Sequence, residues 1–187
     1  MSAQESWGHE MEQDLAERYP WSGADPQEFV AAYRYFVERC SQVAGGASIY
    51  YVWSPVGNKG LERYWPGDGY ADYVGIAVYS FPEWDRDVYG NARSFGEVMD
   101  EKYGRVERFD RPVVVVEMGV TGDGEYQRRW LEEAFRDFDR FPLLRTVVYF
   151  NARDREGAWG EGYQTPDWRI DPLLLYLYPH LFGTVPS

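Results

Sequence analysis

The segment Pro112–Val120 reads PVVVVEMGV, an apolar and largely β-branched run interrupted by one carboxylate. A continuous run of this kind is typical of a parallel strand that is buried on both faces. On either side of it, other apolar runs alternate with segments of helical period, which is the pattern of βαβ units with right-handed crossovers. The segment and its surroundings therefore predict an α/β protein with a parallel sheet.

Five strands are expected along the chain. The runs are Trp7–Met11, Ile49–Trp53, Tyr73–Tyr79, Pro112–Val120 and Leu144–Phe150. The helices expected between and after them run from Asp25-Pro26 to Gly45-Gly46, from Ser94 to about Phe109, from Tyr126 to Phe138 and from Pro172 to Leu181. Ser94 and Glu97 have the spacing of a capping box, so the start of the second helix is well defined.

The length and composition bound the class of protein. A chain of 187 residues can form one domain with a substantial core, whereas a complete (β/α)8 barrel usually needs about 250. The chain is 44% hydrophobic and 27% charged, which is typical of a globular protein and excludes a disordered one. We therefore expect a single domain over residues 1–187 that is not a whole barrel.

The formal net charge of −12 disfavours nucleic acid and anionic membranes as partners, because both are bound through Lys and Arg. A neutral ligand fits better. No apolar run approaches the roughly 20 residues of a spanning helix. The first residues, MSAQESWGHEMEQ, lack the basic and then apolar pattern of a secretory signal, so the expected location is cytoplasmic by default.

Few residues are available for metal or histidine chemistry. The one cysteine, Cys40, lies in an apolar pattern typical of a buried inert thiol, and the two histidines are His9 and His180. One cysteine and two histidines are too few for a typical zinc site or a histidine relay, so no metal and no cofactor are expected. Aromatic residues make up 18% of the chain, which suits stacking on sugar rings and a large core about equally.

No glycine-rich phosphate turn follows any expected strand. The segments Gly119–Gly124 and Gly45-Gly46 lack the G-x-G-x-x-G spacing of a dinucleotide-binding turn. A nucleotide-binding α/β protein is therefore a poor interpretation. The reacting groups should lie at the carboxyl ends of the strands, where barrel and open-sheet enzymes place them.

Two carboxylates stand out at those ends. Glu117 follows four valines in a buried strand, where an isolated charge is costly unless it is paired or faces a cleft. A structural salt bridge is the alternative, but a position near the strand end and just before a glycine favours a functional role. Glu10 ends the first expected strand beside His9, and taken alone it would more often be a surface carboxylate.

Taken together, the two glutamates suggest a specific chemistry. A pair of carboxyls about 5 to 5.5 Å apart across a sugar cleft is the arrangement of retaining glycosidases. Glu117 would attack the anomeric carbon as the nucleophile. Glu10 would protonate the leaving oxygen and then deprotonate the incoming water, which requires it to hold its proton near neutral pH.

Several short motifs carry a family resemblance. In chain order they are His9-Glu10-Met11, Tyr19-Pro20-Trp21, Tyr51-Val52-Trp53-Ser54-Pro55, Val74-Gly75 through Tyr79-Ser80, Val116-Glu117-Met118-Gly119, Tyr149-Phe150-Asn151 and Asp167-Trp168-Arg169-Ile170. In this order they resemble glycoside hydrolase family 26, the β-mannanase family of retaining (β/α)8 barrels. The resemblance spans nearly all of this chain and about the second half of the family's barrel. It implies strands 4 to 8 of such a barrel, the N-terminal half being absent, with the acid/base at Glu10 and the nucleophile at Glu117.

The resemblance also implies roles in substrate binding. His9 would hydrogen-bond near the nucleophile and orient it, and Tyr79 would contact Glu117 or the glycone sugar. Trp21 and Trp53 would line the cleft as stacking surfaces, although a tryptophan inside a strand, such as Trp53, suits the core about as well. Further candidates near strand ends are Asn58, Trp84 and Asn151.

The chain departs from the family pattern in two residues. Glu12 stands where the family commonly has Asn after the His-Glu-Met motif, and Ala77 stands where it commonly has Asp two residues before Tyr79. Strands 1 to 3 of the barrel also have no counterpart. A lone copy is therefore expected to aggregate, to form a homodimer or to take the missing strands from a partner.

Two functions compete on these observations. The first is a retaining glycosidase that cleaves β-1,4-mannan or a related β-glucan, with a polysaccharide or an oligosaccharide as its substrate. The second is a truncated, non-catalytic carbohydrate-binding relic of the same fold. The intact motifs around Glu10 and Glu117 favour the first, whereas Glu12 and the missing strands favour the second.

Overall fold

The computed structural model describes residues 7–13, 19–44 and 48–177. In this part of the chain four parallel strands form one sheet in the order β1-β2-β3-β4. They are β1 (Val52–Trp53), β2 (Tyr73–Ser80), β3 (Val113–Val120) and β4 (Leu144–Tyr149). Parallel neighbours need crossover connections, and the intervening segments provide them. The predicted α/β class with a parallel sheet is confirmed.

Helices lie before, between and after the strands. They are α1 (Pro26–Val43), α2 (Pro82–Tyr89), α3 (Phe95–Val106), α4 (Gly124–Asp137) and α5 (Pro172–Leu177), with the 3-10 turns η1 (Leu61–Tyr64), η2 (Glu107–Phe109) and η3 (Phe138–Arg140). The capping box is confirmed, since Ser94 N donates to Glu97 Oε2 at 2.8 Å and Glu97 N donates to Ser94 Oγ at 3.2 Å. Among the described helices, none combines the length and the apolar character that crossing a membrane would require.

Some predicted elements differ from the structure. The expected strand at Trp7–Met11 is wrong, because this segment is a series of turns. Gly8 has a φ of +73° and Glu10 a φ of +57°, values that an extended strand does not allow. β1 begins at Val52, later than expected, and α2 was not predicted at all. The expected helix ends at Gly45-Gly46 and Leu181 lie outside the described residues.

The chain divides into two compact units. The first comprises Met1–Ala77, Lys102–Val116 and Leu143–Val147. The second comprises Val78–Glu101, Glu117–Pro142 and Val148–Ser187. Each unit has its own core, so each is described separately.

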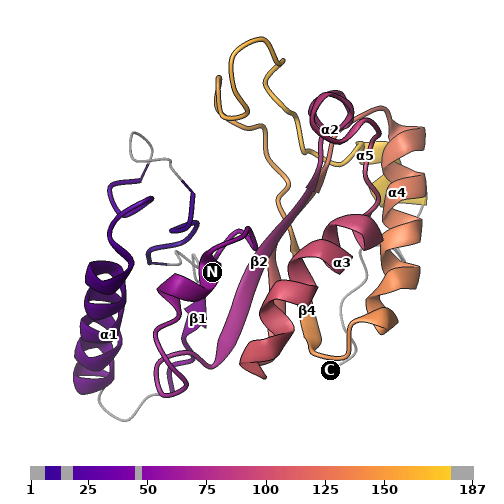
Figure 1. Ribbon diagram of the computed structural model, residues 1–187. Coiled ribbons are helices and arrows are strands. Elements are labelled where there is room, and N and C mark those ends of the chain that lie inside the picture. The colour runs from indigo at the N-terminus through magenta and orange to yellow at the C-terminus, as the bar shows by residue number, and fades with distance from the viewer. Residues whose placement is uncertain (1–6, 14–18, 45–47, 178–187) are drawn as a thin grey trace. The chain divides into compact units, whose positions relative to one another are not determined.

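In the first unit α1 packs against η1, and Figure 1 shows the two side by side. Phe29 and Tyr33 are buried on the inner face of α1, and the ring of Phe29 meets that of Tyr64 edge to face at 5.6 Å. Asp25 fixes the start of α1 by accepting a bond from Gln27 N at 2.8 Å. The segment that carries Glu10 rests on this packing, because Gly8 lies against the Phe29 ring.

In the second unit α3 and α4 share an aromatic core. Phe95 is fully buried and its ring meets Trp130 at 6.0 Å and Phe141 at 6.3 Å. A long connection after β4 extends beside α2, as the orange segment at the top of Figure 1 shows. Tyr163 in this connection donates to Asp87 of α2 at 3.0 Å, which ties the two together.

Candidate active site

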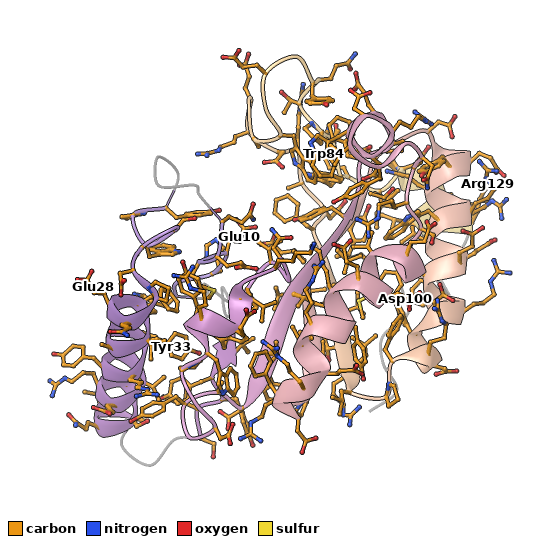
Figure 2. All side chains as sticks on the ribbon, viewed as in Figure 1. Glu10, Glu28, Tyr33, Trp84, Asp100 and Arg129 are labelled. Atoms are coloured by element: carbon orange, nitrogen blue, oxygen red, sulfur yellow. The ribbon has the colours of Figure 1, made fainter. Side chains whose placement is uncertain are left out.

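Glu10 lies in a turn, residues 8–13, whose backbone is fixed by other parts of the first unit. Its N–H donates to the carbonyl of Ser54, just after β1, at 2.9 Å, and its own carbonyl accepts from the Ser22 hydroxyl at 3.3 Å. A left-handed backbone costs a residue other than glycine about 1 to 3 kcal/mol and persists only where the surroundings over-determine it. These bonds hold Glu10 in that conformation (Figure 2).

His9 and Trp21 are brought together beside Glu10. Trp21 Nε1 donates to the His9 carbonyl at 2.8 Å. The ring of Tyr19 stacks on Trp21 at 5.4 Å and meets the His9 imidazole at 4.5 Å. Trp21 is half-buried, so part of its surface stays open. Tyr19 and Trp21 thus pack against His9, next to Glu10 in the turn.

Trp53 lies in the core of the first unit. Its side chain has 0% exposure and packs edge to face against Trp65 at 5.1 Å and Phe109 at 5.3 Å. Of the two interpretations open for this residue, the structure places it as a core side chain, with no face free for a sugar. Asn58, a weaker candidate, contributes its backbone N–H to a bond with Glu12.

The second unit holds Glu117 and Tyr79 together. Tyr79, at the end of β2, donates its hydroxyl to Glu117 Oε2 of β3 at 2.6 Å. A hydrogen bond to an ionised carboxylate is among the stronger ones in proteins. Both side chains are half-buried. The contact that the resemblance implied between these residues is therefore present, and it fixes which way the Glu117 carboxylate faces.

Gly119 makes room for the Tyr79 ring. A Cβ at this position would lie 2.8 Å from the ring of Tyr79 and 2.9 Å from the ring of Trp168. Trp168 is fully buried and lies against Tyr79 with ring centroids 4.6 Å apart. The tyrosine is thus held between a glycine and a tryptophan, so its hydroxyl can meet Glu117 in one orientation.

Aromatic rings from α2 and from the connection after β4 surround Tyr79. Trp84 of α2 meets Trp159 at 5.2 Å, and Trp159 meets Tyr79 at 5.9 Å (Figure 2 labels Trp84). The Asp154 carboxylate accepts the indole N–H of Trp159 at 3.0 Å and that of Trp168 at 3.3 Å. Trp84 and Trp159 are half-buried. Asp154 therefore fixes the orientation of both indoles beside the Tyr79 ring.

Asn151 has a structural contact. Its Oδ1 accepts from Ile170 N at 2.8 Å, although the residue is exposed. Tyr149, two residues earlier, is largely enclosed, and burial raises the pKa of its phenol to about 12. Its hydroxyl donates to the Val120 carbonyl at 3.4 Å, which links β4 to the end of β3.

A buried carboxylate lies directly behind Tyr79. Asp85 of α2 is 2% exposed, and burial raises its pKa. Its Oδ2 accepts from Ser80 Oγ at 3.2 Å and from Arg93 N at 3.2 Å. Because Ser80 follows Tyr79 in β2, this network supports the strand end that carries the tyrosine.

Within residues 7–13, 19–44 and 48–177, no group of three or more His, Cys, Asp or Glu side chains could hold a metal ion. Glu10 belongs to the first unit and Glu117 to the second, and each is held by bonds within its own unit.

The sequence assigned no role in the site to three residues that surround the expected ones. Glu12, Asp85 and Trp159 belong to the hydrogen-bonded or aromatic surroundings of the expected residues. Trp159 lies in an irregular, glycine-rich segment with no periodicity, so pattern alone gives it no partner. Only the departure from the family pattern at Glu12 gave a signal.

The described part of the fold corresponds to part of a (β/α)8 barrel. It aligns with a catalytic domain of a family 26 endo-β-1,4-mannanase from Bacillus sp. JAMB-750 at TM-score 0.55 and 21% identity, covering 86% of this chain and 41% of that one. A modular endo-β-1,4-mannanase from Cellulomonas fimi aligns at TM-score 0.57 and 19% identity, covering 94% and 39%. At these identities the similarity establishes the fold.

The sequence assigns the family. Residues 8–122 match glycosyl hydrolase family 26, and the chain belongs to this family. A β-1,3-xylanase from Vibrio sp. is 23% identical over 168 residues, and one from Alcaligenes sp. is 25% identical over 168 residues. Each alignment covers 80% of this chain and 36% of the relative, so the chain spans about a third of the curated relatives it matches.

Proposed function

We propose that the chain forms the C-terminal part of a retaining glycoside hydrolase, with Glu10 as acid/base and Glu117 as nucleophile. In this mechanism Glu117 attacks the anomeric carbon and the glycosidic C–O bond breaks, while Glu10 gives its proton to the departing oxygen. Glu10 then takes a proton from water as that water attacks the glycosyl-enzyme, which releases Glu117. The step needs no cofactor.

The observation that carries this proposal is the hydrogen bond from Tyr79 to Glu117. A nucleophile must present one oxygen to the sugar, and a donor on the other oxygen fixes that orientation. The packing of Tyr79 between Gly119 and Trp168 makes the donor rigid. A carboxylate used only for a salt bridge would need a cation, whereas the contact found at Glu117 is a neutral hydroxyl.

The substrate proposed is a polysaccharide of β-linked pyranoses, β-1,4-mannan first and a related β-glucan second. Neutral sugars suit a chain whose net charge is −12. Solved structures of similar fold are described as β-1,4-mannanases, and the curated relatives as β-1,3-xylanases, so β-1,3-xylan belongs among the substrates compared. Half-buried Trp21, Trp84 and Trp159 would provide the stacking surfaces.

The test is hydrolysis of mannan, mixed-linkage β-glucan and β-1,3-xylan oligosaccharides by the purified full chain, beside Glu117→Ala and Glu10→Ala. Turnover lost in both variants is expected. Azide distinguishes the two roles on a dinitrophenyl glycoside, whose leaving group departs without a proton. It should restore the Glu117→Ala rate with a glycosyl azide of inverted configuration, and the Glu10→Ala rate with one of retained configuration. Binding of oligosaccharides without turnover by the unchanged chain would instead favour a carbohydrate-binding relic.

Tyr79→Phe tests the observation that carries the proposal. Loss of a hydrogen bond to a charged group is worth about 1.5 to 3 kcal/mol, so kcat/KM should fall by roughly 10- to 100-fold. Tyr163→Phe is the matched control, because it also removes a tyrosine–carboxylate bond, that to Asp87. Equal losses in both variants would contradict a special role for Tyr79.

A further inference from the structure

Glu12 makes a long-range contact that no catalytic role explains. One carboxylate oxygen, Oε1, accepts the backbone N–H of Gly57 at 2.9 Å and that of Asn58 at 3.0 Å. The other oxygen, Oε2, is buried and makes no hydrogen bond within the described residues. The carboxylate is therefore enclosed and faces the segment that follows β1.

That segment, residues 54–58, is held from its other side as well. The Gly57 carbonyl accepts from Arg105 Nη1 at 2.7 Å, and a Cβ on Gly57 would lie 2.9 Å from the side chain of Lys102. Gly57 has a φ of +101°, which favours glycine. Its N–H and its carbonyl are thus both engaged, by Glu12 and by a cation of α3, so the segment offers a fixed surface.

The turn that carries Glu10 is attached to this surface at two places. Glu10 N donates to the Ser54 carbonyl at 2.9 Å, and two residues later Glu12 accepts from Gly57 and Asn58. Ser22 Oγ and Gly23 N hold the carbonyls of Glu10 and Met11 from another segment. On residues 54–58 the turn has one attachment at the left-handed Glu10 and a second at Glu12, and the second fixes the direction in which the turn leaves Glu10. The positive φ of Glu10 is the kind of strain that persists only under such constraint.

We propose that Glu12 is a positioning residue that sets the direction of the Glu10 side chain by clamping residues 54–58. The inference rests on the proposed function, because it assigns Glu12 a role through the acid/base. Glu12 does not touch the sugar, and the effect of losing it falls on proton transfer to the leaving oxygen. A displacement of about 1 Å at a catalytic group can cost roughly 100-fold in rate.

The experiment compares Glu12→Ala, Glu12→Gln and unchanged protein on two substrates. One is a mannooligosaccharide, whose leaving oxygen needs a proton. The other is a dinitrophenyl glycoside of the same sugar, whose leaving group departs unprotonated. The kcat/KM value reports the first bond cleavage in both cases, so the ratio of the two values isolates acid catalysis. Glu28→Ala on α1 is the control for loss of an acidic residue in the same unit.

In Glu12→Ala, kcat/KM for the oligosaccharide is expected to fall roughly 10- to 100-fold, and that for the dinitrophenyl glycoside by less than about threefold. Glutamine keeps an acceptor oxygen at the same reach, so Glu12→Gln should recover most of the loss. Amide hydrogen exchange at Gly57 and Asn58 should speed up in the alanine variant but much less in the glutamine variant.

Other outcomes overturn the inference in distinguishable ways. Equal losses on both substrates, or a glutamine variant as impaired as the alanine variant, would overturn the positioning role while the function of Glu10 and Glu117 stands. A chain that hydrolyses neither substrate before any change would overturn the proposed function and the positioning role together.

Discussion

Asp85 is a carboxylate that the proposed reaction does not use, and it is almost fully enclosed at 2% exposure. Burial raises its pKa, outweighing the bonds from Arg93 N and Ser80 Oγ that favour the charged form. A carboxyl with a raised pKa in the folded chain binds its proton more tightly there than in the unfolded chain. Its contribution to stability is therefore complete below the unfolded pKa and is lost as pH rises through the folded pKa.

Asp85→Asn should remove this pH dependence. Relative to the unchanged protein, the variant should gain stability as pH rises from about 3 to 8, because it has no proton to lose. Urea unfolding midpoints measured across this range check the sign. Asp87→Asn on the same helix, where the carboxylate is exposed, is the control. A stability difference between variant and parent that is constant with pH would contradict the expectation.

The contact between Tyr79 and Glu117 could be predicted from the sequence, whereas most of the surroundings of these residues could not; their catalytic roles stay predictions. Glu117 was predictable because a carboxylate inside PVVVVEMGV is costly without a purpose, and its contact with Tyr79 followed from the resemblance. Glu12 and Trp159 contact partners distant in sequence, Gly57 and Tyr79 respectively, whereas Asp85 bonds to its near neighbours Ser80 and Arg93. A pattern along the chain carries no information on such partners.

The start of α3 is fixed by the local hydrogen bonds between Ser94 and Glu97. Ser94→Ala removes the hydroxyl that accepts from Glu97 N, and should lower the free energy of unfolding by about 1 kcal/mol. Ser94→Gly should cost only a few tenths of a kcal/mol relative to the parent, because glycine also suits the cap position. Urea unfolding of both variants checks the order. If Ser94→Ala were as stable as the unchanged protein, the hydroxyl of Ser94 would not contribute to the cap.

Elements were predictable where their own residues determine them. The capping box and the β-branched runs of β2 and β3 depend on local propensity, and these elements lie where expected. The turn at residues 8–13 depends instead on the Ser54 carbonyl, which accepts from Glu10 N, and on the Ser22 hydroxyl, which donates to the Glu10 carbonyl. The strand predicted from the local sequence is therefore wrong. α2 is short and mostly exposed, and its buried residue is the charged Asp85, so no buried apolar face reveals it.

Among the residues that the structure describes, β1 and β4 are the outer strands of the sheet. Arg145, Thr146 and Val148 of β4 are exposed, and Val148 is 43% exposed. An outer strand with apolar exposure invites pairing with a second copy. The net charge of −12 opposes this association by repulsion, which salt screens.

We therefore expect the 21.8 kDa chain to self-associate in sedimentation, more strongly as salt is added. Val148→Lys places a charge on the outer strand and should shift the chain toward monomer. Val88→Lys, at a residue that is 50% exposed on α2, is the matched control and should leave the association unchanged. A monomer at all salt concentrations, or equal effects of both lysines, would contradict pairing through β4.

The glycine at position 119 bears on how related chains can diverge. Even a methyl group there would overlap Tyr79 and Trp168, so the position of the tyrosine ring requires glycine at residue 119. A descendant that replaces it must rebuild or abandon the Tyr79–Glu117 contact, even if it inherits the glutamate unchanged. Among related sequences that keep the glutamate, those with a glycine two residues later have room for the tyrosine that orients the carboxylate. Those without this glycine do not.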